Sequence, residues 1–288
     1  TNAVYGFLNI LDRMEKDVQP DAVCVAFDLH GPTFRHLQYD GYKATRHGMP
    51  EELAQQMPIM KDVLRAMNIP VYECQGWEAD DVIGTVSVIC SNNDWECVIA
   101  TGDRDSLQLI DPNVHVRLVI TKPGQTTSTL YDEKLFQEEY GFAPKKMVDL
   151  KALMGDSSDN VPGVPKVGPK TAVQLLEKFG NMDNLYAHLD EIEKKGLHDN
   201  LAQNKENAFL SRELVTLQCA RGFSGTLEQL EFQGLASDAL SDVFRANELR
   251  QLERLLEKIP SRSGWVPSQE SEFVPEKLPN YILVNTSE

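Results

Sequence analysis

The sequence predicts an α/β fold: a mostly parallel sheet flanked by helices, followed by an appended helical unit. Strand and helix patterns alternate up to about residue 131, which is typical of parallel sheets covered on both faces. From about residue 132 to residue 259 only helical patterns continue. The 288 residues, 41% of them hydrophobic, are enough to bury a substantial core.

Periodicity predicts the elements of the first part as a helix over residues 4–14, a strand over 22–27, a helix over 51–67, a strand over 70–72, a helix from 78, and strands over 95–101 and 114–120. In such folds ligands bind at the carboxyl ends of the strands. Asp28 and Asp103 each follow a predicted strand there. Both are therefore candidate site residues.

The remaining chain divides by composition. Residues 132–260 form the helical part, which the Gly/Pro-rich stretch GDSSDNVPGVPKVGPKT interrupts. Residues 261–280 are rich in Ser, Pro and Glu and indicate a linker. The stretch YILVNT (281–286) is typical of the first strand of a further domain, and we expect it to lack a partner here. The predicted domains are thus 1–131, 132–260 and 261–288.

Composition excludes several protein classes. No stretch approaches the roughly 20 apolar residues of a membrane span, so we expect no membrane partner and a cytoplasmic location. The five cysteines lack CxxC spacing and are expected to be reduced core residues, not zinc ligands. A net charge of −16 argues at first sight against nucleic-acid binding, but divalent cations would cancel charge wherever acids cluster.

Eight acidic residues form four clusters at strand ends, at a helix start and in a loop: Asp28, Glu78, Asp80, Asp81, Asp103, Asp105, Asp156 and Asp159. Each cluster alone has an ordinary explanation, because acids cap helices and turns. Together, so many carboxylates would repel one another unless cations bind among them. Oxygen ligands favour Mg²⁺ or Mn²⁺ over zinc.

Two such ions would suit the hydrolysis of phosphodiesters, in which metals activate water and neutralise developing charge. A phosphatase that uses the aspartates of GDRD (102–105) as nucleophiles is a weaker alternative, because it leaves EADD (78–81) and the Gly/Pro-rich hairpin over 161–172 unexplained. No GxxxxGK[ST] loop suggests nucleotide triphosphate binding.

The stretch VPGVPKVGPKTA (161–172) predicts a tight hairpin followed by a helix that begins at Pro169. Exposed amides near the helix start and neighbouring lysines would form a phosphate cradle. The candidate DNA-binding residues are Gly163, Lys166, Gly168, Lys170 and Thr171. An ordinary loop between helices is the alternative.

Residues 33–50 combine basic and aromatic side chains, including Arg35, Tyr42, Lys43 and Arg46. Such a pattern suits a mobile segment that grips single-stranded DNA through phosphates and stacked bases. A solvated surface loop explains the pattern equally well.

The motifs, taken in order, resemble those of the 5′ nuclease domain of bacterial DNA polymerase I, a family that is similar to phage and eukaryotic flap endonucleases. The matching stretches lie within residues 1–258 and are VAFD with TFRH, YKATR, GWEADDVIGT, ATGDRDSLQL and LMGDSSDNVPGVPKVGPKTA. The resemblance implies a PIN-like α/β core with a helical arch over about residues 30–57. It also implies a helix-three-turn-helix DNA-binding unit.

The resemblance further assigns roles to residues. It implies one metal site formed by Asp28, Glu78 and Asp80 with Asp81 close by, and another formed by Asp103, Asp105, Asp156 and Asp159. Lys43 and Arg35 would contact the scissile phosphate. The hairpin around residues 163–168 would hold duplex DNA, commonly with a K⁺ ion, and the metal sites would hold two Mg²⁺ or Mn²⁺ ions.

The implied activity is metal-dependent cleavage at 5′ flaps, nicks and 5′ ends of DNA, including RNA primers on DNA. The implied partners are this DNA and the polymerase domains of the same parent chain, and we expect a monomer. The family's first strand, which carries a further metal-binding Asp, would lie before Thr1. Without that strand, a catalytically impaired DNA-binding fragment is the alternative.

Overall fold

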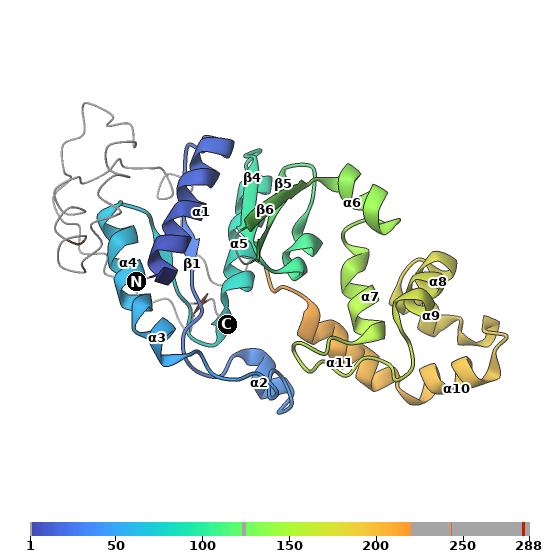
Figure 1. Cartoon of the computed structure of the whole chain (residues 1–288). Coiled ribbons are helices and arrows are strands. Elements are labelled where there is room, and N and C mark those ends of the chain that lie inside the picture. Colours follow the sequence, from blue (N-terminus) through green and yellow to red (C-terminus); the bar gives the residue numbers. More distant parts are fainter. Residues whose placement is uncertain (1, 123–124, 220–242, 244–283, 286–288) are drawn as a thin grey trace. The chain divides into compact units, whose positions relative to one another are not determined.

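The computed structural model describes residues 2–122, 125–219, 243 and 284–285 (Figure 1). The chain divides into two compact units. The first comprises residues 1–31, 48–82 and 222–288, and the second comprises residues 32–47 and 83–221. The predicted linker over 261–280 lies outside the described residues. The predicted boundary at residues 131 and 132 stays a prediction.

The first unit is built around two helices and a short parallel strand pair. Its elements are α1 (Asn2–Val18), β1 (Val25–Ala26), α3 (Glu51–Ala54), α4 (Gln56–Ala66), β2 (Val71–Tyr72) and β3 (Trp77–Glu78). Helix α1 contacts α4, and their apolar faces bury Val4, Leu8 and Val63 in one core with Phe27. β1 pairs with β2 in parallel, with Val25 opposite Val71. The strand predicted over 22–27 is thus present, although only two of its residues join the ladder.

The expectation that the stretch 281–286 lacks a partner is wrong. Residues Val284–Asn285 form β7, which pairs in parallel with β3, so that Trp77 lies opposite Val284. The physical reason is that the backbone of β3 offers donors and acceptors that an extended segment can satisfy. Sequence patterns show whether a segment is extended, but they do not show what it pairs with.

The second unit contains a sheet of three strands in the order β4-β5-β6. β4 (Cys97–Thr101) and β5 (Val114–Lys122) are parallel, and β6 (Gln125–Tyr131) pairs antiparallel with β5. β6 was not predicted, because its sequence QTTSTLY has few apolar residues and is mostly exposed. Parallel pairing holds for β1–β2, β3–β7 and β4–β5, which confirms the mostly parallel strand arrangement in the described residues.

Helices make up the rest of the second unit. They are α2 (Phe34–Gln38), α5 (Ala79–Asn92, which starts in the first unit), η1 (Arg104–Leu109), α6 (Glu133–Tyr140), α7 (Lys146–Met154), α8 (Pro169–Phe179), α9 (Met182–Ala187), η2 (Leu189–Glu191), α10 (Lys195–Gln203) and α11 (Lys205–Val215). Helix α7 packs against α8 and α11 (Figure 1). Buried residues from the sheet and from helices α6 to α11 form one core that includes Leu118, Phe136, Leu153 and Leu176.

The helical character predicted from residue 132 onward is confirmed up to Val215, where α11 ends. Pro169 is the first residue of α8, as predicted. None of the described helices has the length and apolar character needed to cross a membrane.

Candidate functional site

The four acids of the first unit gather at the start of α5. Asp28 follows β1, and its Oδ1 accepts a hydrogen bond from the amide of Ala79 at 2.8 Å. Asp81 accepts from the amide of Glu78 at 3.1 Å, and both Asp81 and Glu78 are buried. Asp80 lies beside them in the first turn of α5. Carboxylates therefore satisfy amide groups that a helix start leaves unpaired, as acids commonly do.

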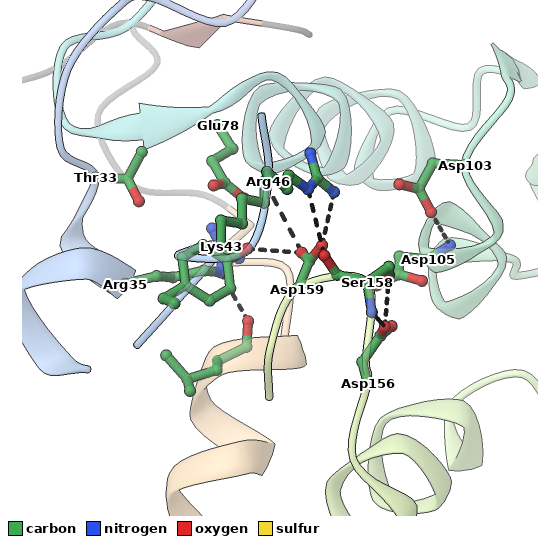
Figure 2. Close-up of polar contacts among 12 residues, drawn as sticks. Thr33, Arg35, Lys43, Arg46, Glu78, Asp103, Asp105, Asp156, Ser158 and Asp159 are labelled. Carbon is green, nitrogen blue, oxygen red and sulfur yellow. Dashed lines mark hydrogen bonds and ion pairs between the residues drawn. The ribbon is translucent and has the colours of Figure 1, made fainter. Parts of the chain in front are cut away.

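In the second unit, Asp103 and Asp105 lie directly after β4. Asp103 is the N-cap of η1, and its carboxylate accepts from the amide of Asp105 at 2.8 Å (Figure 2). The side chain of Asp105 contacts the ammonium of Lys151 on α7. The carboxyl end of β4 thus presents two carboxylates, one capping a helical turn and one bound to a partly buried cation.

Lys151 also bonds to a second predicted site residue. Its Nζ donates to Oδ2 of Asp156 at 2.6 Å as well as to Oδ1 of Asp105, so one ammonium bridges two carboxylates. Only 15% of the Lys151 side chain is exposed. Lys151 is not among the site residues predicted from the sequence. The available signal was a single cation within DLKALMGD, one helical turn before the acidic loop.

Burial and charge set the pKa values in this cluster. Burial raises the pKa of Asp105 to about 6, although Lys151 opposes the shift, and the carboxylates of Asp103 and Asp156 add to it. For Asp156, burial alone would raise the pKa, but hydrogen bonds from Lys151 and Ser158 outweigh it and hold the pKa at about 2. Burial alone would lower the pKa of Lys151, yet its two carboxylate partners raise it. The pKa shifts of Asp156 and Lys151 thus reflect a cation held among acids, whereas the raised pKa of Asp105 reflects its burial.

The loop after α7 carries the remaining two acids and directs them to different partners. Asp156 exchanges two backbone hydrogen bonds with Val161, at 3.0 Å and 2.7 Å, which closes the loop. Gly155 and Gly163 pack so closely that a Cβ on Gly163 would meet the nitrogen of Gly155 at 2.2 Å. Their positive φ angles, 75° and 58°, also suit glycine. The loop sequence therefore needs glycine at both positions.

Asp159 binds the middle of the basic and aromatic segment over residues 33–50. Its carboxylate accepts from Nη2 of Arg46 at 2.6 Å and from the hydroxyl of Tyr42 at 3.0 Å, and Nζ of Lys43 lies 3.9 Å away (Figure 2). The carbonyl of Asp159 also accepts from the amide of Lys43 at 2.9 Å. The segment predicted to be mobile is therefore tied to the acidic loop in this structure.

Two predictions about this segment are not supported by where the side chains lie. Tyr42 is 3% exposed and packs with Val161 and Leu214, so its ring is not available for stacking on a base. Arg35 is 1% exposed, and its guanidinium donates to the carbonyls of Leu214 at 2.7 Å and Thr216 at 3.0 Å. A buried guanidinium that binds main-chain oxygens stabilises the fold, so contact of Arg35 with a scissile phosphate finds no support here.

The predicted phosphate cradle is partly exposed. Lys166 and Lys170 are exposed, Gly168 is the N-cap of α8, and Thr171 is half-buried in its first turn. Gly163 is buried, and its amide donates to the hydroxyl of Ser211 at 2.9 Å. The structure therefore gives Gly163 a role in shaping the loop, while the start of α8 offers free space beside Gly168.

Metal-binding geometry is incomplete in the described residues, where no group of three or more His, Cys, Asp or Glu side chains comes together in a form that could hold an ion. Asp105 and Asp156 nevertheless share the Lys151 ammonium, so their oxygens already hold one cation in common. Carboxylate oxygens are the ligands that Mg²⁺ and Mn²⁺ prefer. The donor chemistry therefore fits a divalent ion, and the membership of each metal site stays a prediction.

Comparison with known proteins gives two consecutive family matches. The 5'-3' exonuclease N-terminal resolvase-like domain matches residues 1–141, and the 5'-3' exonuclease C-terminal SAM fold matches residues 142–238. DNA polymerase I of Bacillus caldotenax is 40% identical over 272 residues, which are 94% of this chain and 30% of that protein. DNA polymerase I of Geobacillus stearothermophilus is 42% identical over 234 residues, which are 81% of this chain and 26% of that protein. The chain thus spans about a third or less of these relatives.

Solved structures agree with the fold. T5 5'-exonuclease with bound zinc ions has a TM-score of 0.64 at 21% identity, covering 89% of this chain and 90% of that chain. The catalytic core of Rad2 in complex with DNA substrate has a TM-score of 0.57 at 16% identity, covering 88% and 83%. At these identities the likeness shows the fold, and it confirms the predicted PIN-like α/β core with an appended helical unit.

Proposed function

Because the chain belongs to the 5′-3′ exonuclease family, we propose that it is a divalent-metal-dependent nuclease that hydrolyses DNA at 5′ ends and 5′ flaps. One observation in the second unit carries the proposal. The carboxylates of Asp105 and Asp156, which come from different elements, converge on one cation, and Asp159 in the same loop binds the basic side chains of residues 43 and 46. Carboxylates that could hold metal ions next to basic side chains suit the hydrolysis of phosphodiesters.

The proposed ions are two Mg²⁺ or Mn²⁺, which would activate water and neutralise charge on the phosphate. One set of ligands would be the acids around the start of α5, namely Asp28, Glu78, Asp80 and Asp81. The other set would be the acids after β4 and in the loop after α7, namely Asp103, Asp105, Asp156 and Asp159. Supporting this division, each set lies within one unit and joins residues that are distant in sequence.

Other residues would bind the nucleic acid. Lys43 and Arg46 lie beside Asp159 of the acidic loop and would contact phosphates once a substrate competes for them. The exposed start of α8, with Lys166 and Lys170, would hold the phosphates of a duplex, because a helix N-terminus attracts anions. A K⁺ ion at the hairpin is part of this proposal.

The proposed substrates are DNA with a 5′ flap, a nick or a 5′ end, and RNA primers on DNA. The matched relatives are DNA polymerases I, so we propose that polymerase domains of a longer parent chain act on the same DNA. A monomer in the bacterial cytoplasm fits this role.

The test is cleavage of a 5′-labelled flap DNA in Mg²⁺ and in EDTA. We expect cleavage only with Mg²⁺. Asp105→Asn should slow it by about 100-fold or more, because a lost ligand costs at least as much as a lost outer-shell group. Asp190→Asn is the matched control, since Asp190 is exposed on η2 and the charge change is the same. Equal cleavage in EDTA, or full activity of Asp105→Asn, would contradict the proposal.

A DNA-binding role without cleavage is the second candidate. The observation in its favour is that Asp105, Asp156 and Asp159 each have a cationic side-chain partner from this chain. This candidate expects flap binding that persists in EDTA and no product with Mg²⁺. Gel-shift and cleavage assays on one preparation distinguish the two functions.

A further inference from the structure

We propose that Lys151 is a built-in counter-cation, whose ammonium holds Asp105 and Asp156 together in the metal-free protein and must leave when a divalent ion binds them. The inference rests on the proposed function in one respect, namely that these two aspartates bind metal. Lys151 is thereby a positioning residue that sets the concentration of divalent ion at which Asp105 and Asp156 bind it.

The contacts show why the ammonium and an ion exclude each other. Nζ of Lys151 bonds to Oδ1 of Asp105 and Oδ2 of Asp156, so it occupies the space that an ion shared by these oxygens would need. Two positive charges in that space would repel at short range in a poorly solvated setting. A divalent ion therefore binds only if it replaces the two charge-assisted hydrogen bonds of Lys151.

The main chain of Lys151 provides a fixed base for this exchange. Its carbonyl accepts from the amide of Gly155 at 2.8 Å, which anchors the start of the acidic loop to α7. The long side chain of lysine has four rotatable bonds and leaves a carboxylate pair without moving the helix. The loop consequently keeps its place while the ammonium and the ion exchange.

The charge balance gives the direction of the effect. With Lys151 in place, the charges of the two acids are already neutralised in part. The free energy gained when a divalent ion binds is therefore smaller than it would be without the ammonium. A neutral side chain at this position removes the competitor and leaves two carboxylates without their cation. We therefore expect tighter metal binding together with a less stable metal-free protein.

The experiment compares Lys151→Met and Lys151→Arg with the wild-type protein, and Lys145→Met is the control. Lys145 is exposed at the N-cap of the same helix, so its substitution changes net charge equally. Calorimetric titration with MnCl₂ should give a dissociation constant about tenfold lower for Lys151→Met, which corresponds to the loss of one charge-assisted hydrogen bond. Lys151→Arg and Lys145→Met should stay near the wild-type value.

Thermal melting provides the second readout. Lys151→Met should melt about 2 to 4 °C lower than wild type in EDTA and recover more with Mn²⁺, whereas Lys151→Arg should melt close to wild type. If Lys151 had only a structural role, Lys151→Met would lower the melting temperature equally in EDTA and in Mn²⁺, and the affinity for Mn²⁺ would be unchanged or weaker. That result would overturn the inference.

The two proposals fail in distinguishable ways. If the wild-type protein binds Mn²⁺ and cleaves flap DNA but Lys151→Met binds no tighter, only the counter-cation is refuted. If Lys151→Met binds Mn²⁺ tighter but no variant cleaves DNA with Mg²⁺, the counter-cation stands and the nuclease proposal fails. If no variant binds Mn²⁺, both are refuted.

Discussion

Two acids of the first unit and three acids of the second unit bind different kinds of partner. Asp28 and Asp81 accept hydrogen bonds from backbone amides at the start of α5. Asp105, Asp156 and Asp159 bind the side-chain cations of Lys151 and Arg46. A backbone amide cannot leave its carboxylate without local unfolding, but a side-chain cation can. Asp105, Asp156 and Asp159 of the second unit can therefore exchange their side-chain cations for other partners without local unfolding.

The largest expected effect tests the loop that presents the exchangeable acids. Gly163→Ala should cost about 3 kcal/mol or more, because alanine is strained at a φ of 58° and its Cβ would overlap the backbone of Gly155. Chemical denaturation measures the loss. Gly168→Ala is the matched control, since its φ is −94° and nothing lies within 4 Å of the added Cβ. Equal stabilities of the two variants would contradict the close approach.

An intermediate effect tests the backbone-bound acid of the first unit. Asp28→Ala should destabilise the protein by about 1 kcal/mol in EDTA, because the amide of Ala79 loses its acceptor. Asp28→Asn keeps an oxygen acceptor and should lose only a small part of that stability. If Asp28→Asn were as unstable as Asp28→Ala, charge and not hydrogen bonding would hold this cluster, and the contrast between the units would disappear.

The smallest expected stability effect concerns the ion pair between Arg46 and Asp159. Arg46→Met should change the free energy of unfolding by about 1 kcal/mol or less, because the pair is partly exposed. The relative loss of DNA affinity should be larger than the loss of stability. The slope of log affinity against log salt concentration should become less steep by about 1. Fluorescence anisotropy at several salt concentrations measures both quantities. Lys122→Met, an exposed cation at the end of β5, serves as the control. An unchanged salt slope for Arg46→Met would remove this residue from the DNA contacts.

The order and type of most elements could be predicted from the sequence because their signals are local. Apolar spacing predicted α1 and β5, and the proline at residue 169 predicted the start of α8. Strand β6 was not predicted because its residues are mostly polar. It is a strand because it pairs with β5, and this pairing cannot be seen in its own residues. The pairing of β7 with β3 was not predicted for the same reason.

The candidate metal-binding and phosphate-binding residue types can be identified from the sequence, since acid clusters and the glycine-rich hairpin are visible in it. The partners of these residues depend on the fold. Lys151 and Asp105 are 46 residues apart, and Arg46 and Asp159 are 113 apart, so no local pattern reveals either pair. Burial likewise depends on packing, which is why Arg35 and Tyr42 looked like surface residues in the sequence and are buried in the fold. Ion pairing and burial require groups to meet in space, and the fold alone brings them together.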